Sequence, residues 1–198
     1  MPRRITHRYV DPLDAIWLQA AHAMGLRVER DPEVFAATDG RGTLRLGTPE
    51  TLDADDCLAQ MVFHEICHWI VEGEAALGLP DWGLDNVTDR DLWREEATLR
   101  LQAALLQPHG LRQVLAPTTD HRARYDTLPA DPAEGAAEPV ARRLAEALRR
   151  AERPPWAPHL QRALRATAGI ARLLCELGAH RAGEGLPSLW ERYEPPAG

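Results

Sequence analysis

The sequence contains no lysine, so all 23 of its basic side chains are arginines, and its 30 aspartates and glutamates leave a net charge of −7. An acidic chain exerts no long-range attraction on a phosphate backbone. Adjacent arginines such as Arg142 and Arg143 have the spacing of a solvated helix face rather than of a basic patch. We therefore expect no nucleic-acid partner.

Cysteine is also scarce, and long apolar runs are missing. The three cysteines do not have the spacing of a disulfide framework, which favours a reducing compartment. No stretch approaches the roughly 18 apolar residues of a membrane span, and no signal-peptide pattern opens the chain. The sequence thus predicts a cytoplasmic protein without a membrane partner, and it leaves the oligomeric state open.

Hydrophobic periodicity and turn residues predict an α+β fold. Asp11 and Pro12 are typical of a helix start and Gly25 of a helix end. Alternating residues over 26–47, interrupted by a glycine-containing turn, predict a small antiparallel sheet. Further helices are expected near residues 53–72, 89–107, 140–152 and 158–178.

Composition also suggests how the 198 residues are divided. Residues 117–139 are rich in proline, aspartate, alanine and glycine, which is typical of a connector. We expect a compact core over 1–116, a connector over 117–139, a C-terminal helical extension over 140–182 and a loosely ordered tail over 183–198.

One segment carries recognisable chemistry, Phe63-His64-Glu65-Ile66-Cys67-His68-Trp69. His64 and His68 are four residues apart, so on a helix both imidazoles can reach the same metal ion. Glu65 lies about 100° further round the helix, where its carboxylate can take a proton from metal-bound water without being a ligand. This is the HExxH pattern of zinc peptidases, and it predicts Zn²⁺ at His64 and His68 with Glu65 as the catalytic base.

A tight zinc site needs a third ligand, and four glutamates are in range: Glu72, Glu74, Glu95 and Glu96. Glu72 extends the histidine row by another turn, which on a straight helix is too far from the ion. Glu74 stands where metzincins place their third ligand, but position 71 is valine where that pattern needs glycine.

The choice between Glu95 and Glu96 rests on helical-wheel angles. Glu96 falls inside an apolar arc that includes Leu92 and Leu99, whereas Glu95 falls at the polar boundary of that arc. A carboxylate on a buried face is costly unless it is paired or bound to metal. We therefore expect Glu96 to be the ligand and Glu95 to be the second choice, with a Glu96–Arg100 ion pair as the alternative reading of Glu96.

The order of these elements resembles the core of gluzincin metalloproteases. A helix, a small sheet, the HExxH helix and a glutamate-bearing helix all precede residue 116, and the run from Glu96-Ala97 to Gln107-Pro108 is similar to cytosolic members of that group. The resemblance implies a zincin-like core in which a distant glutamate completes the zinc site.

A second, more local resemblance is to the elongation factor P hydroxylase family. It is carried by His64-Glu65-Ile66, His68-Trp69, Gly73 and Asp81-Trp82-Gly83. It implies that His64, Glu65, His68 and Glu96 form the site of an enzyme that hydroxylates a modified lysine on a translation factor. Two histidines and one carboxylate are also the ligand set of non-haem Fe²⁺ oxygenases, so spacing alone does not choose between zinc and iron.

Taken together, the sequence favours a zinc-dependent hydrolase that attacks a peptide or amide bond of a peptide or protein substrate. The alternatives are an Fe²⁺-dependent protein hydroxylase and a non-catalytic metal site whose helical extension docks a partner. Core packing is the first expectation for Trp82, and lining of a substrate cleft is the alternative, whereas Cys67 is expected in the core. The candidates for stabilising the oxyanion are His109, His121, Tyr125 and Arg100.

Overall fold

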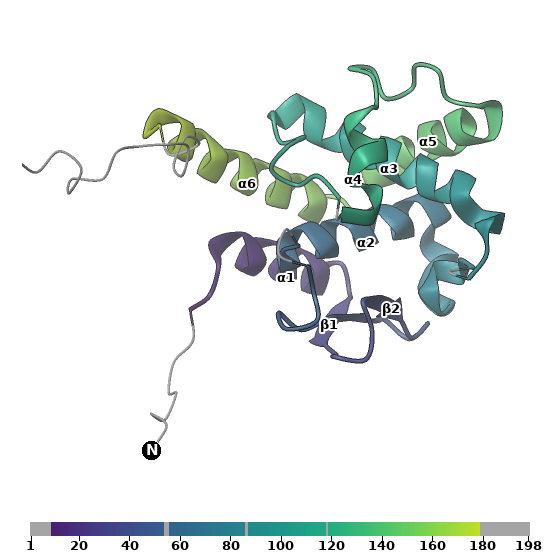
Figure 1. The fold of residues 1–198 in the computed structure, drawn as a ribbon, viewed down its shortest axis with the longest axis horizontal. Coiled ribbons are helices and arrows are strands. Elements are labelled where there is room, and N and C mark those ends of the chain that lie inside the picture. Colours follow the sequence, from purple (N-terminus) through teal and green to yellow (C-terminus); the bar gives the residue numbers. More distant parts are fainter. Residues whose placement is uncertain (1–8, 54–55, 86, 118, 179–198) are drawn as a thin grey trace, which may run out of the picture.

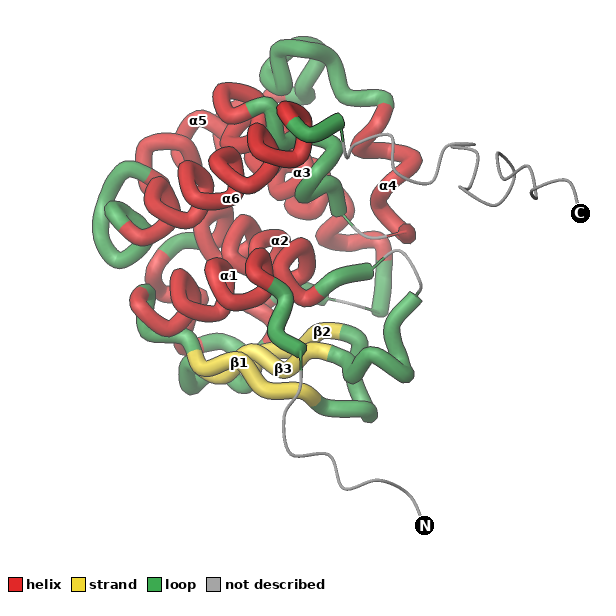
Figure 2. Tube along the Cα trace, turned by 90° about the vertical axis from the view of Figure 1, so that its left-hand side faces the viewer, coloured by secondary structure: helices red, strands yellow, loops and turns green. Residues whose placement is uncertain are grey.

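The computed structural model describes residues 9–53, 56–85, 87–117 and 119–178. It confirms a fold that mixes helices with a small sheet (Figures 1 and 2). The elements are α1 (Pro12–Ala23), β1 (Arg27–Arg30), β2 (Ala36–Thr38), β3 (Thr43–Leu46), α2 (Leu58–Glu72), α3 (Leu92–Leu106), α4 (Thr119–Asp126), α5 (Glu138–Ala151) and α6 (His159–Glu176). Short 3₁₀ turns at Glu74–Gly78, Asp81–Gly83 and Asp89–Asp91 connect α2 to α3, and another at Gln107–His109 follows α3.

These elements form three layers. The sheet lies on one side of the α1–α2 layer, and α3, α5 and α6 cover the opposite side (Figure 2). Helix α2 contacts α1, α3 and α5, so it is the central helix of the molecule. Thirteen of its 15 residues are buried, which is the pattern of a helix packed on all sides.

The sheet is mixed rather than antiparallel, which corrects one expectation. β2 and β3 pair antiparallel as predicted, but β1 pairs parallel with β3, and the strand order is β1-β3-β2. The pairing follows burial, because Leu44 and Leu46 of β3 are fully buried and this strand takes the middle position. Residue alternation predicts strands but carries no information about which neighbour each one selects.

Helix α2 begins later than predicted. Cys57 is its N-cap, and the Cys57 thiol accepts a hydrogen bond from the Gln60 amide, while the Gln60 side chain accepts one from the Cys57 amide. This reciprocal cap fixes the start of the HExxH helix at Leu58. Asp53 and Asp56 therefore precede the helix instead of forming its first turn.

The C-terminal helices share the core of the N-terminal elements. Leu144 on α5 and Leu164 on α6 belong to the same buried cluster as Trp17 on α1 and Ile66 on α2. The expected connector, 117–139, contains a helix of its own, α4. The tail expected over 183–198 lies outside the described residues. No helix within the described ranges is both long and apolar enough to cross a membrane.

Candidate metal centre

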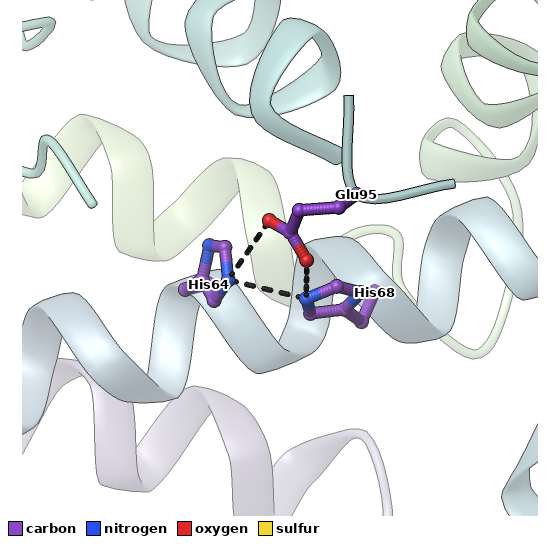
Figure 3. A group of neighbouring side chains, drawn as sticks. All are labelled: His64, His68 and Glu95. Carbon is purple, nitrogen blue, oxygen red and sulfur yellow. Dashed lines mark hydrogen bonds and ion pairs between the residues drawn. The ribbon is translucent and has the colours of Figure 1, made fainter. Parts of the chain in front are cut away.

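Three side chains on the two central helices converge at one point. His64 and His68 project from α2 toward Glu95 on α3 (Figure 3). The two Nε2 atoms are 3.1 Å apart, Glu95 Oε2 lies 3.1 Å from His68 Nε2, and Glu95 Oε1 lies 3.6 Å from His64 Nε2. Tetrahedral zinc with bonds of about 2.0–2.1 Å separates its ligand atoms by about 3.3 Å, so these spacings match the edges of such a site.

Hydrogen bonds on the far side of each ring fix which nitrogen faces the centre. Gln102 Nε2 donates to the Leu115 carbonyl at 2.7 Å, so Gln102 Oε1 turns toward His64 Nδ1, 2.9 Å away. The His64 Nδ1–H must therefore be the donor. In the neutral ring this leaves the lone pair of Nε2 directed at the centre.

His68 is fixed in the same way by α3. The Thr98 hydroxyl donates to the Arg94 carbonyl at 3.1 Å, so it accepts from His68 Nδ1 at 3.2 Å. Both Nε2 lone pairs and the Glu95 carboxylate then face one another. Glu95 Oε1 is buried and accepts no hydrogen bond in the part of the chain that the structure describes. Three bases directed at one another repel unless they share a positive charge, so the residues present fit a divalent metal ion.

The pKa shifts of the three side chains agree with the need for a positive charge between them. Burial lowers the pKa of His68, but the neighbouring Glu95 carboxylate outweighs burial and raises the pKa to about 9. Burial also lowers the pKa of His64 below its ordinary value. Burial opposes ionisation of Glu95, yet the two imidazoles hold the pKa of this carboxyl well below its usual range. A proton on His68 can thus provide the positive charge, and a divalent ion bound here would displace it.

Glu96, the expected ligand, lies on another side of α3. Its carboxylate accepts hydrogen bonds from Arg100 Nε and from Arg124 Nε on α4, each at 2.7 Å. The geometry therefore replaces Glu96 with Glu95 as the candidate ligand, and the Glu96–Arg100 ion pair is the reading that the structure bears out. The helical-wheel prediction was wrong because the apolar arc that includes Leu99 packs toward α4. The face of α3 that meets α2 is the one that carries polar residues.

The three residues open onto a cleft of 370 Å³. Glu65 and Trp82 both line this cleft, and Trp82 is at the same time part of the buried core cluster. The indole Nε1–H of Trp82 donates to Glu65 Oε2 at 2.7 Å. On the sheet side the wall is formed by Phe35, Ala36 and Ala37.

Of the proposed oxyanion donors, only His121 lies in the cleft. Its ring stacks on His64 with centroids 5.6 Å apart, its Nδ1 is 3.9 Å from Glu95 Oε1, and its side chain is 36% exposed. Tyr125, one turn further along α4, is buried in a separate cluster beside Leu99, and burial raises its pKa to about 12. Tyr125 therefore does not line the cleft. Neither do the remaining candidates, His109 and Arg100.

Sequence reasoning missed the residues that orient the ligands. Thr98 and Gln102 are buried polar side chains three and seven positions after Glu95, so all three share one face of α3. A polar stripe on an otherwise buried helix was the available signal. Cys67 is fully buried in the core, as expected.

No family model, curated protein or solved structure matches the chain.

Proposed function

We propose that the protein is a zinc-dependent hydrolase with a zincin-like core that cleaves a peptide or amide bond in a peptide or protein substrate. The observation that carries the proposal is the inward orientation of two histidine lone pairs and one carboxylate at tetrahedral spacing, beside a glutamate that is not part of the group. Zinc bound by His64, His68 and Glu95 would supply a Lewis acid with an open coordination position.

Two side chains in the cleft support this proposal. Glu65 follows His64 in sequence, and its carboxylate lines the cleft beside the three ligands. There it can take a proton from the attacking water and pass it to the leaving nitrogen. His121 stacks over His64, and its half-exposed ring can donate a hydrogen bond to the oxyanion of the tetrahedral intermediate.

The wall of the cleft favours an extended peptide as substrate. β2 is an edge strand whose only strand neighbour in the sheet is β3. The Gly47 amide donates to the Phe35 carbonyl and the Asp39 amide to the Thr43 carbonyl, so the intervening Ala36 directs its backbone groups away from β3. Since Ala36 lines the cleft, its N–H and C=O can pair with the backbone of a bound chain.

The experiment is a peptide-library cleavage assay on the zinc-loaded protein and its Glu65→Gln variant. We expect cleavage by the wild type and a loss of turnover of at least about a hundredfold in Glu65→Gln, because removal of a general base has this order of effect. Zinc content should stay unchanged, since Glu65 is not a ligand. The matched control is Glu74→Gln, which alters an exposed glutamate on the turn after α2.

Two results would contradict the proposal. Full activity of Glu65→Gln would remove the assigned base. Absence of cleavage by the wild type, combined with oxygen consumption by an iron-loaded protein, would favour the hydroxylase alternative instead.

A further inference from the structure

The 3₁₀ turn at Asp81–Gly83, between α2 and α3, has an unusual backbone. Asp81 and Trp82 have φ values of 49° and 56°, a conformation that is unfavourable for residues with a Cβ. Two such residues in succession persist only where surrounding contacts impose them, and such contacts are concentrated at functional sites. Trp82 is also 2% exposed, so the turn holds a large aromatic ring inside the molecule.

Contacts from the sheet and from α3 hold this turn in place. The Thr38 amide of β2 donates to Asp81 Oδ1 at 2.9 Å, and the Trp82 amide donates to Thr38 Oγ1 at 3.3 Å. From the other side, Arg94 Nη1 on α3 donates to the Gly83 carbonyl at 3.2 Å. The turn is thus fixed between the cleft wall and the helix that carries Glu95.

The ring of Trp82 is fixed as well. It stacks on Trp69, which follows His68 on α2, with centroids 6.0 Å apart and planes 11° from parallel. In this position its Nε1–H donates to Glu65 Oε2 at 2.7 Å. Within the described residues this is the one hydrogen bond that the Glu65 carboxylate accepts from another residue.

We propose that Trp82 is a positioning residue that holds one oxygen of the Glu65 carboxylate and leaves the other to accept the proton of the attacking water. On this proposal, the strained conformation of the turn serves to place the indole Nε1–H of Trp82 beside the Glu65 carboxylate. The hydrogen bond to Oε2 restrains rotation of the carboxylate, so the same Oε1 can take the proton and deliver it to the leaving nitrogen. The catalytic part of this inference rests on the proposed hydrolase function, whereas the hydrogen bond itself does not.

The hydrogen bond is tested by the ¹H–¹⁵N spectrum of the six tryptophan indoles in the full-length protein. Trp82→Phe identifies the Trp82 resonance by its disappearance. Glu65→Ala should shift this resonance and accelerate its hydrogen exchange at least about tenfold, because the acceptor is lost. Glu74→Ala, the matched control, should leave it unchanged. A Trp82 indole that does not respond to Glu65→Ala would overturn the inference whether or not the protein is a hydrolase.

The positioning role is tested by the kinetics of Trp82→Phe, which keeps an aromatic ring against Trp69 and removes the donor. We expect kcat to fall roughly ten- to a hundredfold with KM changed less than about twofold, as for loss of one hydrogen bond to a charged group. Zinc content should be that of the wild type. The control is Trp93→Phe on α3, where the half-exposed ring lies against Arg143 and outside the cleft.

The possible outcomes separate the two proposals. Wild-type kcat in a folded, zinc-loaded Trp82→Phe protein would overturn the positioning role and leave the hydrolase proposal standing. If the wild type cleaves no peptide while the indole responds to Glu65→Ala, the hydrolase proposal fails and the hydrogen bond stands. If Trp82→Phe is too unstable to assay, the Trp82 indole is assigned through its contact with the Trp69 ring, and its response to Glu65→Ala still tests the hydrogen bond.

Discussion

Glu95 and Glu96 are neighbours on α3, yet their carboxylates have different partners. Successive helical residues are rotated by about 100°, so one carboxylate meets the histidines of α2 while the other meets the guanidinium groups of Arg100 and Arg124. The Glu95 side chain is 18% exposed and that of Glu96 19% exposed. Burial therefore does not distinguish them, and the identity of the partner does.

The first prediction concerns this pair. Glu95→Ala should reduce zinc affinity at least about a hundredfold, because two histidines alone leave the site incomplete. Glu96→Ala should keep the zinc affinity of the wild type and lower the free energy of unfolding, since Arg100 loses its carboxylate partner. Competition titration with a zinc chelator measures both. Equal losses of affinity in the two variants would refute the assignment of Glu95.

The sequence was sufficient for the part of the site that lies on one helix. The spacing of His64, Glu65 and His68 fixes their relative directions once the segment is helical, and the structure brings all three to the same cleft. Glu95 could not be selected in this way, because its choice depends on which face of α3 meets α2. The helical wheel counted Leu92 in the apolar arc, but this residue is 61% exposed.

At the scale of elements, the centre lies between two facing polar stripes. The α2 stripe has a residue every fourth position, and its members meet α3 in reverse order, so the two helices run antiparallel. The pairs are His64 with Gln102, His68 with Thr98 and Glu72 with Arg94. Polar stripes inside an apolar core are stable because nearly every donor and acceptor finds a partner.

The second prediction concerns the orienting hydrogen bonds. Thr98→Val keeps the shape of the side chain but removes the acceptor of the His68 Nδ1–H. We expect zinc affinity to fall roughly ten- to a hundredfold, the usual effect of losing such a partner. Thr167→Val on α6 is the matched control, because its buried hydroxyl accepts a hydrogen bond from Trp17 Nε1 and not from a candidate ligand. If the two variants lower zinc affinity equally, Thr98 has no orienting role.

Other features of the elements could not be predicted from local sequence. The parallel pairing of β1 with β3 depends on which strand is most buried, which only the assembled layers determine. Helix α4 lies in a stretch whose composition is typical of a connector. Its Arg124 pairs with Glu96 and its Tyr125 packs beside Leu99, so contacts with α3 override the weak local signal.

At the scale of the whole molecule, the helices after the connector contribute to the core around the candidate metal centre. Arg150 on α5 donates to the carbonyls of Ile70 and Val71 at the end of α2, at 3.1 and 2.7 Å. Trp156, between α5 and α6, packs against Trp69, with ring centroids 5.2 Å apart. We therefore expect the described residues to unfold as one cooperative unit, with the predicted extension included.

The third prediction tests this cooperativity with Leu164→Ala. Leu164 on α6 is fully buried, so the substitution should lower the free energy of unfolding by about 2–5 kcal/mol. Tryptophan fluorescence and zinc release should shift together to lower denaturant concentrations. Leu177→Ala, at an 80% exposed leucine, is the control and should change neither. Two separate transitions, with zinc release unaffected by Leu164→Ala, would show that the C-terminal helices form an independent unit.

The central claim, a zinc centre at His64, His68 and Glu95, is tested most directly by the metal content of the full-length protein. The protein is purified anaerobically without a histidine tag or a chelator and analysed by mass spectrometry. The account predicts about one zinc ion per chain, bound through three ligands with an open fourth position. About one iron per chain, or no metal even after reconstitution with zinc, would contradict it.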